Sequence, residues 1–246
     1  MSLQKQFEET GAWLFRWRSY LPLVFIVVII PAFQQFSYPF GSHTYHLLWG
    51  MFCLSVSLFG LFIRCYTIGY VPKGTSGRNT KMQVAETLNT TGIYSVVRNP
   101  LYLGNFFMML GVTMFPRVWW VSIIYVLTFW LYYERIIMAE EAFLKTKFGV
   151  NYENYLARTP AFIPDFRLWQ PNTLSFSFRN VLKREYSGFM AVIAAFTILE
   201  FFGDYIQEGT LVFDLVWVSI FTFGLIVYVA LLTLKKKTRL LDVEGR

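Results

Sequence analysis

Long stretches without charge dominate this chain and restrict what it can fold into. Residues 19–63, 99–116, 118–133 and 215–234 contain no Asp, Glu, Lys or Arg. Because a helix needs about 20 apolar residues to cross the hydrocarbon core of a bilayer, such runs are typical of membrane-spanning segments. Charged residues make up 15% of the chain, whereas a soluble domain carries about 25%. We therefore expect an all-α, polytopic integral membrane helical bundle.

About six transmembrane helices account for these runs. The run 19–63 is too long for one helix, and a turn that contains Pro39 and Gly41 divides it. Only Pro116 and Arg117 separate the third span from the fourth, so these two spans should form a tight helical hairpin. The predicted spans are residues 20–36, 46–63, 101–115, 118–133, 186–202 and 213–234.

Lysine and arginine are confined to alternate loops. Residues 1–19, 64–100, 134–185 and 235–246 hold all of the 22 basic residues except Arg117. Because cytoplasmic loops are enriched in Lys and Arg, both termini and the two long polar loops should be cytoplasmic. The net charge of +7 then reflects topology, and no nucleic-acid partner is expected, since the charge is divided among loops. Residues 1–18 do not resemble a cleaved signal peptide, so we expect the first span to remain.

The chain divides by polarity into three parts. Residues 1–70 should form an amphipathic lead and two spans, and residues 171–246 a linker, two further spans and a basic cytoplasmic tail. Residues 71–170 hold nearly all the unusual polar side chains. Within them, residues 134–158 predict a long helix that leaves the membrane and is interrupted at Gly149. Pro160 and Pro164 then predict an extended path.

The sequence Arg98-Asn99-Pro100 predicts a helix start at the membrane surface. Pro100 suits the first helical turn, and Asn99 is a candidate side-chain cap. One interpretation is structural, with Arg98 reaching to the lipid headgroups. The other is functional, because the free N–H groups and positive dipole end of a helix bind carboxylates and phosphates. Gly104 and Gly111 should share a face that packs closely on another helix.

Two adjacent carboxylates, Glu140 and Glu141, lie on the predicted helix that leaves the membrane. Neighbouring helical residues point about 100° apart, so one carboxylate could face the protein and accept from ribose hydroxyls or an ammonium group. A solvated helix with a Glu141–Lys145 pair is the structural alternative. Arg135 could anchor the helix at the membrane surface or hold an anionic substrate group.

Other polar and aromatic residues suggest no further site. Tyr152 and Tyr155 are typical of anchors at a membrane interface. His43 and His46 have no Cys, Asp or Glu near them in the sequence, so we expect no metal site. The chain also lacks a phosphate-binding glycine loop and a dinucleotide fingerprint.

Several short motifs between residues 75 and 165 are individually common but together form a more specific pattern. They are Gly92-x-Tyr94, Arg98-Asn99-Pro100-Leu101-Tyr102-Leu103-Gly104, Glu140-Glu141, Phe148-Gly149-x-x-Tyr152-x-x-Tyr155 and Ile163-Pro164. Together they resemble the isoprenylcysteine carboxyl methyltransferase family, whose wider group includes membrane phospholipid N-methyltransferases. The resemblance covers roughly a third of the chain.

The resemblance implies a cofactor site for S-adenosylmethionine on the cytoplasmic side of a membrane-embedded helical core. It gives Arg135 and Glu141 candidate catalytic roles. The family has His where this chain has Asn99, and a substrate-binding Arg that aligns with Ile136 rather than Arg135. The cofactor-binding residues that it implies are Asn79, Glu86, Thr87, Leu88, Asn89, Tyr94, Arg98, Asn99, Pro100, Leu101, Tyr102 and Glu140.

The function that these residues favour is methyl transfer to a membrane lipid or lipidated substrate. A sulfonium methyl donor needs alignment and exclusion of water but no metal. A carboxylate or phosphate oxygen is already ionised and needs no general base, whereas an amine would need one, for which Glu141 or Tyr102 is a candidate. The alternatives are a phospholipid amine N-methyltransferase, a nicotinamide-dependent membrane reductase and a non-catalytic membrane protein. The expected membrane is the inner membrane of a bacterium or the endoplasmic reticulum of a eukaryote; the sequence leaves the lipid and the oligomeric state open.

Overall fold

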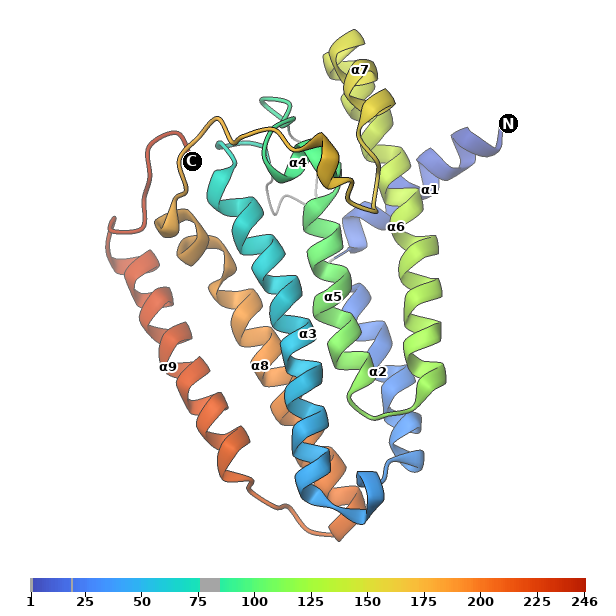
Figure 1. Ribbon diagram of the computed structural model, residues 1–246, viewed down its shortest axis with the longest axis vertical. Helices are drawn as coiled ribbons and strands as arrows, with labels where there is room; N and C mark the ends of the chain where they lie inside the picture. The colour runs from blue at the N-terminus through green and yellow to red at the C-terminus, as the bar shows by residue number, and fades with distance from the viewer. Residues whose placement is uncertain (1, 19, 76–84) are drawn as a thin grey trace.

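The computed structural model describes residues 2–18, 20–75 and 85–246. Within these residues the regular structure is helical, and the only β pairing is an isolated bridge between Gly92 and Gln170. The predicted all-α class is therefore confirmed. Figure 1 shows the long helices running side by side in one bundle. The helices are α1 (Leu3–Trp17), α2 (Leu21–Ala32), α3 (His43–Tyr70), α4 (Ile93–Val96), α5 (Pro100–Met114), α6 (Trp119–Phe148), α7 (Val150–Arg158), α8 (Phe178–Glu208) and α9 (Leu215–Lys237).

Each of the six predicted spans coincides with a helix of the bundle. Among the described residues, α3, α6, α8 and α9 are long and apolar enough to cross a membrane. The helix α5 is apolar but has only 15 residues, and α2 has 12. The chain is thus an integral membrane protein, and full crossing by α2 and α5 remains a prediction.

Glycines allow α3 and α5 to pack closely. A side chain at Gly60 would overlap the carbonyl oxygen of Gly104, and one at Gly111 would overlap the carbonyl oxygen of Cys53. The predicted close packing through Gly104 and Gly111 is therefore confirmed. It brings the polar start of α5 beside the end of α3.

The predicted hairpin between the third and fourth spans is also present. It joins α5 to α6 through a tight turn in which Arg117 has a φ of 59°. The helix α6 then continues through the predicted exit from the membrane to Phe148, and Gly149, with a φ of 52°, ends it before α7. Figure 1 shows the end of α6 and all of α7 standing above the bundle.

Two further contacts shape the end of the bundle near α4. The amphipathic helix α1 packs along α6, where a side chain at Gly11 would overlap the Arg135 carbonyl. The extended segment after α7 is hydrogen-bonded to the segment around α4: the Arg98 N–H donates to Pro160 O, and the Asp165 N–H to Val96 O, both at 2.9 Å. The predicted stop is confirmed, because α7 ends at Arg158; the chain bends at residues 161–163, and the extended path at the two prolines stays a prediction.

Both chain ends lie at the same end of the bundle as α4 (Figure 1). This arrangement is what an even number of crossings requires. The compartment that this end faces remains a prediction from the charge distribution.

The expectation that no acidic residue lies near the two histidines is wrong. At the other end of the bundle, Glu200 of α8 lies 2.9 Å from the Nε2 atom of His46. The error has a simple reason: α8 returns to this end of the bundle, so residues 154 positions apart in the sequence become neighbours.

Candidate active site

A cavity of about 670 Å³ lies at the α4 end of the bundle. Its volume falls within the range of about 300–1,000 Å³ that is usual for small-molecule sites. The walls come from α1, α3, α5, α6 and α8, together with residues between α3 and α5. All three predicted parts of the chain therefore contribute to it.

Many of the residues that the resemblance implicates meet at this cavity. The lining residues among them are Tyr94, Arg98, Asn99, Pro100, Leu101, Tyr102 and Glu140. Asn89 lies behind this wall, where its side chain hydrogen-bonds to Tyr94. Glu86 packs its carboxyl group against the lining residue Gly74. Thr87 and Leu88 do not line the cavity, and Asn79 lies outside the described residues.

The start of α5 differs in detail from the prediction. Pro100 occupies the first helical turn as expected, but the Asn99 side chain makes no capping hydrogen bond. Its Nδ2 atom instead donates to the carbonyl oxygen of Ala161, 3.0 Å away. The predicted cap at Asn99 is therefore wrong, because the extended segment after α7 crosses close to the helix start and uses the amide.

Arg98 connects the start of α5 to α6 and α7. Its Nη2 atom lies 2.8 Å from Glu141 Oε1, and its Nη1 atom donates to the carbonyl oxygens of Leu156 and Thr159. Among the described residues its buried Nε atom has no hydrogen-bond partner. Arg98 therefore holds protein groups rather than reaching to lipid headgroups.

The two adjacent glutamates of α6 have different surroundings. Glu141 pairs with Arg98 and not with Lys145, which pairs with Glu153 at 2.9 Å. Glu140 lines the cavity and hydrogen-bonds to Tyr102. Adjacent residues of a helix point about 100° apart, so Glu140 faces the cavity while Glu141 faces Arg98.

Arg18 forms the wall of the cavity opposite Glu140. Its Nη1 atom lies 3.8 Å from Glu140 Oε1 and 3.3 Å from the Tyr102 hydroxyl. The Phe15 ring, one turn earlier, packs under the guanidinium at 4.0 Å. The end of α1 therefore supplies a cation to the site, which the sequence motifs did not reveal.

A second polar wall joins three helices. Arg64 at the end of α3 makes two hydrogen bonds of 2.8 Å to the carboxylate of Glu185 on α8. Its Nη1 atom donates to Asn105 of α5 at 2.7 Å. The motifs missed all three residues, although Arg64 and Glu185 each stand where an apolar run ends and charge resumes.

The tyrosines of α7 are structural rather than interfacial. Tyr152 is 2% exposed and Tyr155 is 4% exposed, so the predicted membrane anchors are wrong. The Tyr155 hydroxyl donates to the carbonyl oxygen of Tyr94 at 2.7 Å, which positions a cavity residue. Burial raises the pKa of the Tyr94 hydroxyl, so this side chain remains a neutral donor.

Arg135 lies apart from the cavity. Its guanidinium stacks at 5.2 Å over the ring of Phe7 on α1, and neither Arg135 nor Glu141 is a lining residue. Ile136, which aligns with the arginine of the family, is fully buried in the core.

A second hollow lies at the surface beside the end of α7. Its volume is about 750 Å³, and residues 156–168 line most of it. The motif residues Ile163 and Pro164 line it, but none of the residues that the resemblance gives as cofactor-binding or catalytic does. We therefore place the candidate active site in the cavity at the bundle end.

Comparisons with known proteins identify the same region of the chain. Residues 45–151 match the family model described as phospholipid methyltransferase. The Protein-S-isoprenylcysteine O-methyltransferase of Schizosaccharomyces pombe is 38% identical over 77 residues, which are 31% of this chain and 33% of that protein. No solved structure matches the chain.

Two bacterial relatives carry other names. The cobalt-zinc-cadmium resistance protein CzcN of Cupriavidus metallidurans is 37% identical over 84 residues, or 34% of this chain and 38% of that protein. The nickel-cobalt-cadmium resistance protein NccN of Alcaligenes xylosoxydans xylosoxydans is 36% identical over 83 residues, with the same coverage of both chains. The matched segments thus span little more than a third of these relatives. These matches support the family indicated by the motifs: residues 45–151 match the phospholipid methyltransferase model, and the chain is similar to an isoprenylcysteine methyltransferase.

Proposed function

We propose that this protein is an S-adenosylmethionine-dependent methyltransferase that modifies a carboxylate or phosphate oxygen of a membrane lipid or lipidated substrate. The observation that carries the proposal is the convergence of the motif residues on one cavity. Segments around residues 94–102 and at residue 140 line that cavity together, within the part of the chain that matches the family.

The side chains of the cavity fit the groups of this cofactor. S-adenosylmethionine combines an apolar ring system with ribose hydroxyls, an ammonium group and a carboxylate. Leu101, Phe143 and Leu144 offer apolar lining for the ring, and Glu140 offers an acceptor for hydroxyls or the ammonium group. The carboxylate would find a cation at Arg18, whose guanidinium already lies at the cavity wall.

Bound S-adenosylmethionine would supply a methyl group on a sulfonium cation, from which the acceptor oxygen gains a C–O bond as the C–S bond breaks and the sulfur keeps the electron pair. The protein's part is to align the two partners and exclude water. Tyr102 and Glu140 hold one wall in place through their hydrogen bond. The Arg64–Glu185 pair fixes a second part of the lining.

The charges around the cavity favour an anionic acceptor. Four arginines but only two glutamates line it among the described residues. Both glutamates lie beside an arginine, Glu140 beside Arg18 and Glu185 beside Arg64. A carboxylate or phosphate could accept charge-assisted hydrogen bonds from these guanidinium groups, and it needs no base to remove a proton.

The cavity continues toward the apolar part of the bundle. Met108 lies about two turns, or about 10 Å, further along α5 than Leu101, and both residues line the cavity. Gly188 lines it from α8. This continuity suits a substrate whose polar group meets the arginines while its apolar chain remains among the helices.

Binding of S-adenosylmethionine to the purified full chain in detergent tests the proposal. We expect saturable binding of one molecule per chain, and Glu140→Gln should weaken it roughly tenfold or more, because a charged hydrogen-bond partner is lost. Glu134→Gln is the matched control, since Glu134 is an exposed residue of the same helix, and it should leave binding unchanged. Saturable binding of NADPH instead, with no binding of S-adenosylmethionine, would favour the reductase alternative.

A further inference from the structure

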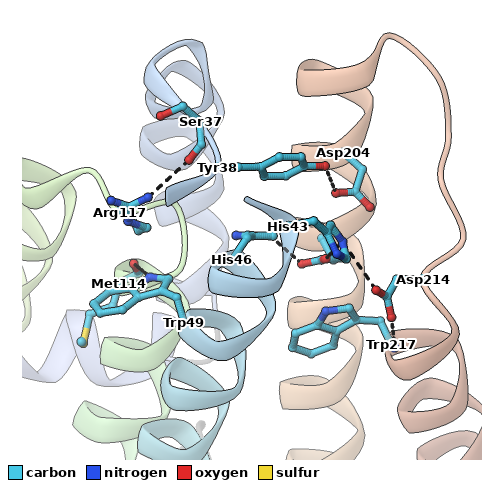
Figure 2. A network of polar contacts seen from close by, with 11 residues as sticks. Ser37, Tyr38, His43, His46, Trp49, Met114, Arg117, Asp204, Asp214 and Trp217 are labelled. Carbon is cyan, nitrogen blue, oxygen red and sulfur yellow. Dashed lines mark hydrogen bonds and ion pairs between the residues drawn. The ribbon is translucent and has the colours of Figure 1, made fainter. Parts of the chain in front are cut away.

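A cluster of titratable side chains lies at the end of the bundle opposite the cavity. Figure 2 shows His43, His46, Asp204 and Asp214 pointing toward one another between three helices, and Glu200 lies among them. His43 is separated from the cavity residue Arg64 by about 30 Å along α3, at 1.5 Å per residue. The cluster is therefore distinct from the candidate active site.

Helical spacing explains why these side chains meet. His43 and His46 lie in the first turn of α3, three residues apart and thus on one face. Glu200 and Asp204 lie one turn apart on α8. Asp214 is the N-cap of α9, where its Oδ1 atom accepts from the N–H groups of Val216 and Trp217 at 2.7 and 3.3 Å.

The cluster contains buried polar atoms that lack partners. Glu200 has no solvent-exposed surface, and neither its Oε1 atom nor the Nε2 atom of His43 has a hydrogen-bond partner among the described residues. These two atoms face each other at 3.8 Å, which is too long for a hydrogen bond. A buried carboxylate in this position is costly unless a cation compensates it.

We propose that a divalent transition-metal ion of the Zn²⁺ type binds between His43 Nε2, Glu200 Oε1 and Asp214 Oδ2. In a tetrahedral zinc site with ligands at about 2.0–2.2 Å from the metal, the ligand atoms lie about 3.3–3.6 Å apart. His43 Nε2 lies 3.5 Å from Asp214 Oδ2 and 3.8 Å from Glu200 Oε1. One ligand atom from each of the three residues lies within 4.8 Å of the other two, so the three side chains would draw together around a bound ion.

The donor set favours a transition metal over Ca²⁺ or Mg²⁺. Calcium and magnesium prefer oxygen ligands alone, whereas zinc and cobalt accept mixed imidazole and carboxylate sets. Three protein ligands leave a fourth position for water. The His43 side chain is 41% exposed although its Nε2 atom is buried, so the proposed site lies close to the protein surface.

Neighbouring groups already hold the proposed ligands in place. His46 Nε2 lies 2.9 Å from the second oxygen of Glu200, so Oε1 stays directed at His43. The backbone N–H groups of α9 occupy Asp214 Oδ1 and leave Oδ2 free for the ion. Such outer contacts are the usual support of a metal site.

An ion at this position would connect three helices. The helix α9 already packs against α8, for example where Gly224 meets the Ile193 side chain, and an ion would join both helices to the start of α3. Glu200 and Asp214 also lie beyond residues 45–151, which match the family. His43 also precedes the matched residues, so all three proposed ligands lie outside the part of the chain that matches the family.

Titration of the metal-stripped, tag-free full chain with Co²⁺ tests the proposal. We expect visible absorption bands that saturate at one equivalent and disappear when Zn²⁺ is added. His43→Ala and Asp214→Asn should each weaken binding about tenfold or more; asparagine retains the helix cap but loses the charge. The control is Glu208→Gln, which removes an exposed charge at the same end of α8 and should leave affinity unchanged.

Several results would overturn the proposal. The first is the absence of saturable Co²⁺ absorption bands. The second is a Co²⁺ affinity of Asp214→Asn equal to that of the native chain. The third is a loss of Co²⁺ affinity in Glu208→Gln as large as the loss in the ligand variants. If the variants do not fold, X-ray absorption of the zinc-loaded native chain decides the question. A ligand shell with imidazole nitrogen and oxygen at about 2.0–2.2 Å is expected, and a shell of oxygen alone contradicts the site.

Discussion

At the scale of single residues, Asn99 shows how a departure from a family motif can be compatible with the site. Its amide donates to the carbonyl oxygen of Ala161 while the residue lines the cavity. A histidine ring also offers an N–H donor at this position, whereas an aspartate offers only acceptors. The structural requirement is thus a donor, which both Asn and His satisfy.

Two substitutions of Asn99 test whether this position requires a hydrogen-bond donor. Histidine keeps an N–H donor, and aspartate replaces the donor with a carboxylate. Asn99→His should retain the thermal stability of the detergent-purified protein and its affinity for S-adenosylmethionine. Asn99→Asp should cost about 1–3 kcal/mol of stability, because it places a carboxylate against a carbonyl oxygen. Thermal unfolding and cofactor titration of the two variants check this. Equal behaviour of both variants would show that the contact with Ala161 is unimportant.

Arg98 is the second residue whose role the structure changes. Its guanidinium binds a carboxylate and two carbonyl groups at once, with a side chain that is 13% exposed. A lysine carries one compact ammonium group and cannot reproduce this forked geometry. Arg98 therefore acts first as a brace that positions the start of α5.

Replacement of Arg98 should lower the stability of the protein even when the positive charge is kept. Arg98→Lys should lower the free energy of unfolding by about 1–3 kcal/mol, because buried acceptors lose their donors. Lys145→Gln, which breaks the exposed pair with Glu153, should cost less than about 1 kcal/mol. Thermal unfolding of the two variants in one detergent gives the comparison. A loss at Lys145 equal to that at Arg98 would contradict the brace.

At the scale of helices, the sequence predicts much of the fold. Apolar runs and the glycines and prolines at their ends locate the helices, because helix length in a bilayer and turn chemistry are local properties. Packing between helices is not local. Arg18, Arg64 and Glu185 lie in different parts of the sequence and reach one cavity only through the folded bundle. The pairing of His46 with Glu200 was missed for the same reason.

The helix α1 illustrates this dependence on packing, because it brings Phe15 and Arg18 to the cavity. Gly11→Leu should displace α1 from α6, since even a Cβ atom there overlaps the Arg135 carbonyl. Affinity for S-adenosylmethionine should fall while the bundle stays folded. Thr10→Leu places the same leucine side chain at the adjacent exposed position and should leave affinity unchanged. Native affinity in Gly11→Leu would show that α1 is not part of the site.

At the scale of the whole molecule, the bundle has two chemically different ends. Both termini and α7 lie at one end (Figure 1), where residues around α4 also line the cavity. The histidine–carboxylate cluster, drawn in Figure 2, lies at the first turn of α3 and thus at the other end. The distribution of Lys and Arg predicts that the cavity end is cytoplasmic. A cofactor made in the cytoplasm would then reach the cavity directly.

Cysteine labelling in sealed vesicles tests this orientation. In a background where Cys53 and Cys65 are replaced by Ala, Glu153→Cys at the α7 end should react with an impermeant maleimide only from the cytoplasmic side. Gln207→Cys at the far end of α8 should react only from the opposite side, because both positions are exposed. Labelling of both from one side would contradict the predicted topology.

Transfer of a labelled methyl group from S-adenosylmethionine to membrane lipid is the most direct test of the proposed function. Membranes that contain the native protein should incorporate label into the lipid-extractable fraction, and membranes with Glu140→Gln should lose most of it while Glu134→Gln retains it. Label on a carboxylate oxygen would be released as methanol in mild alkali, label on a phosphate oxygen would be identified by mass, and label on nitrogen would resist alkali. Label that depends on Glu140 and sits on oxygen is the predicted result. No incorporation above that of membranes lacking the protein, across the lipid and lipidated fractions, would contradict the account.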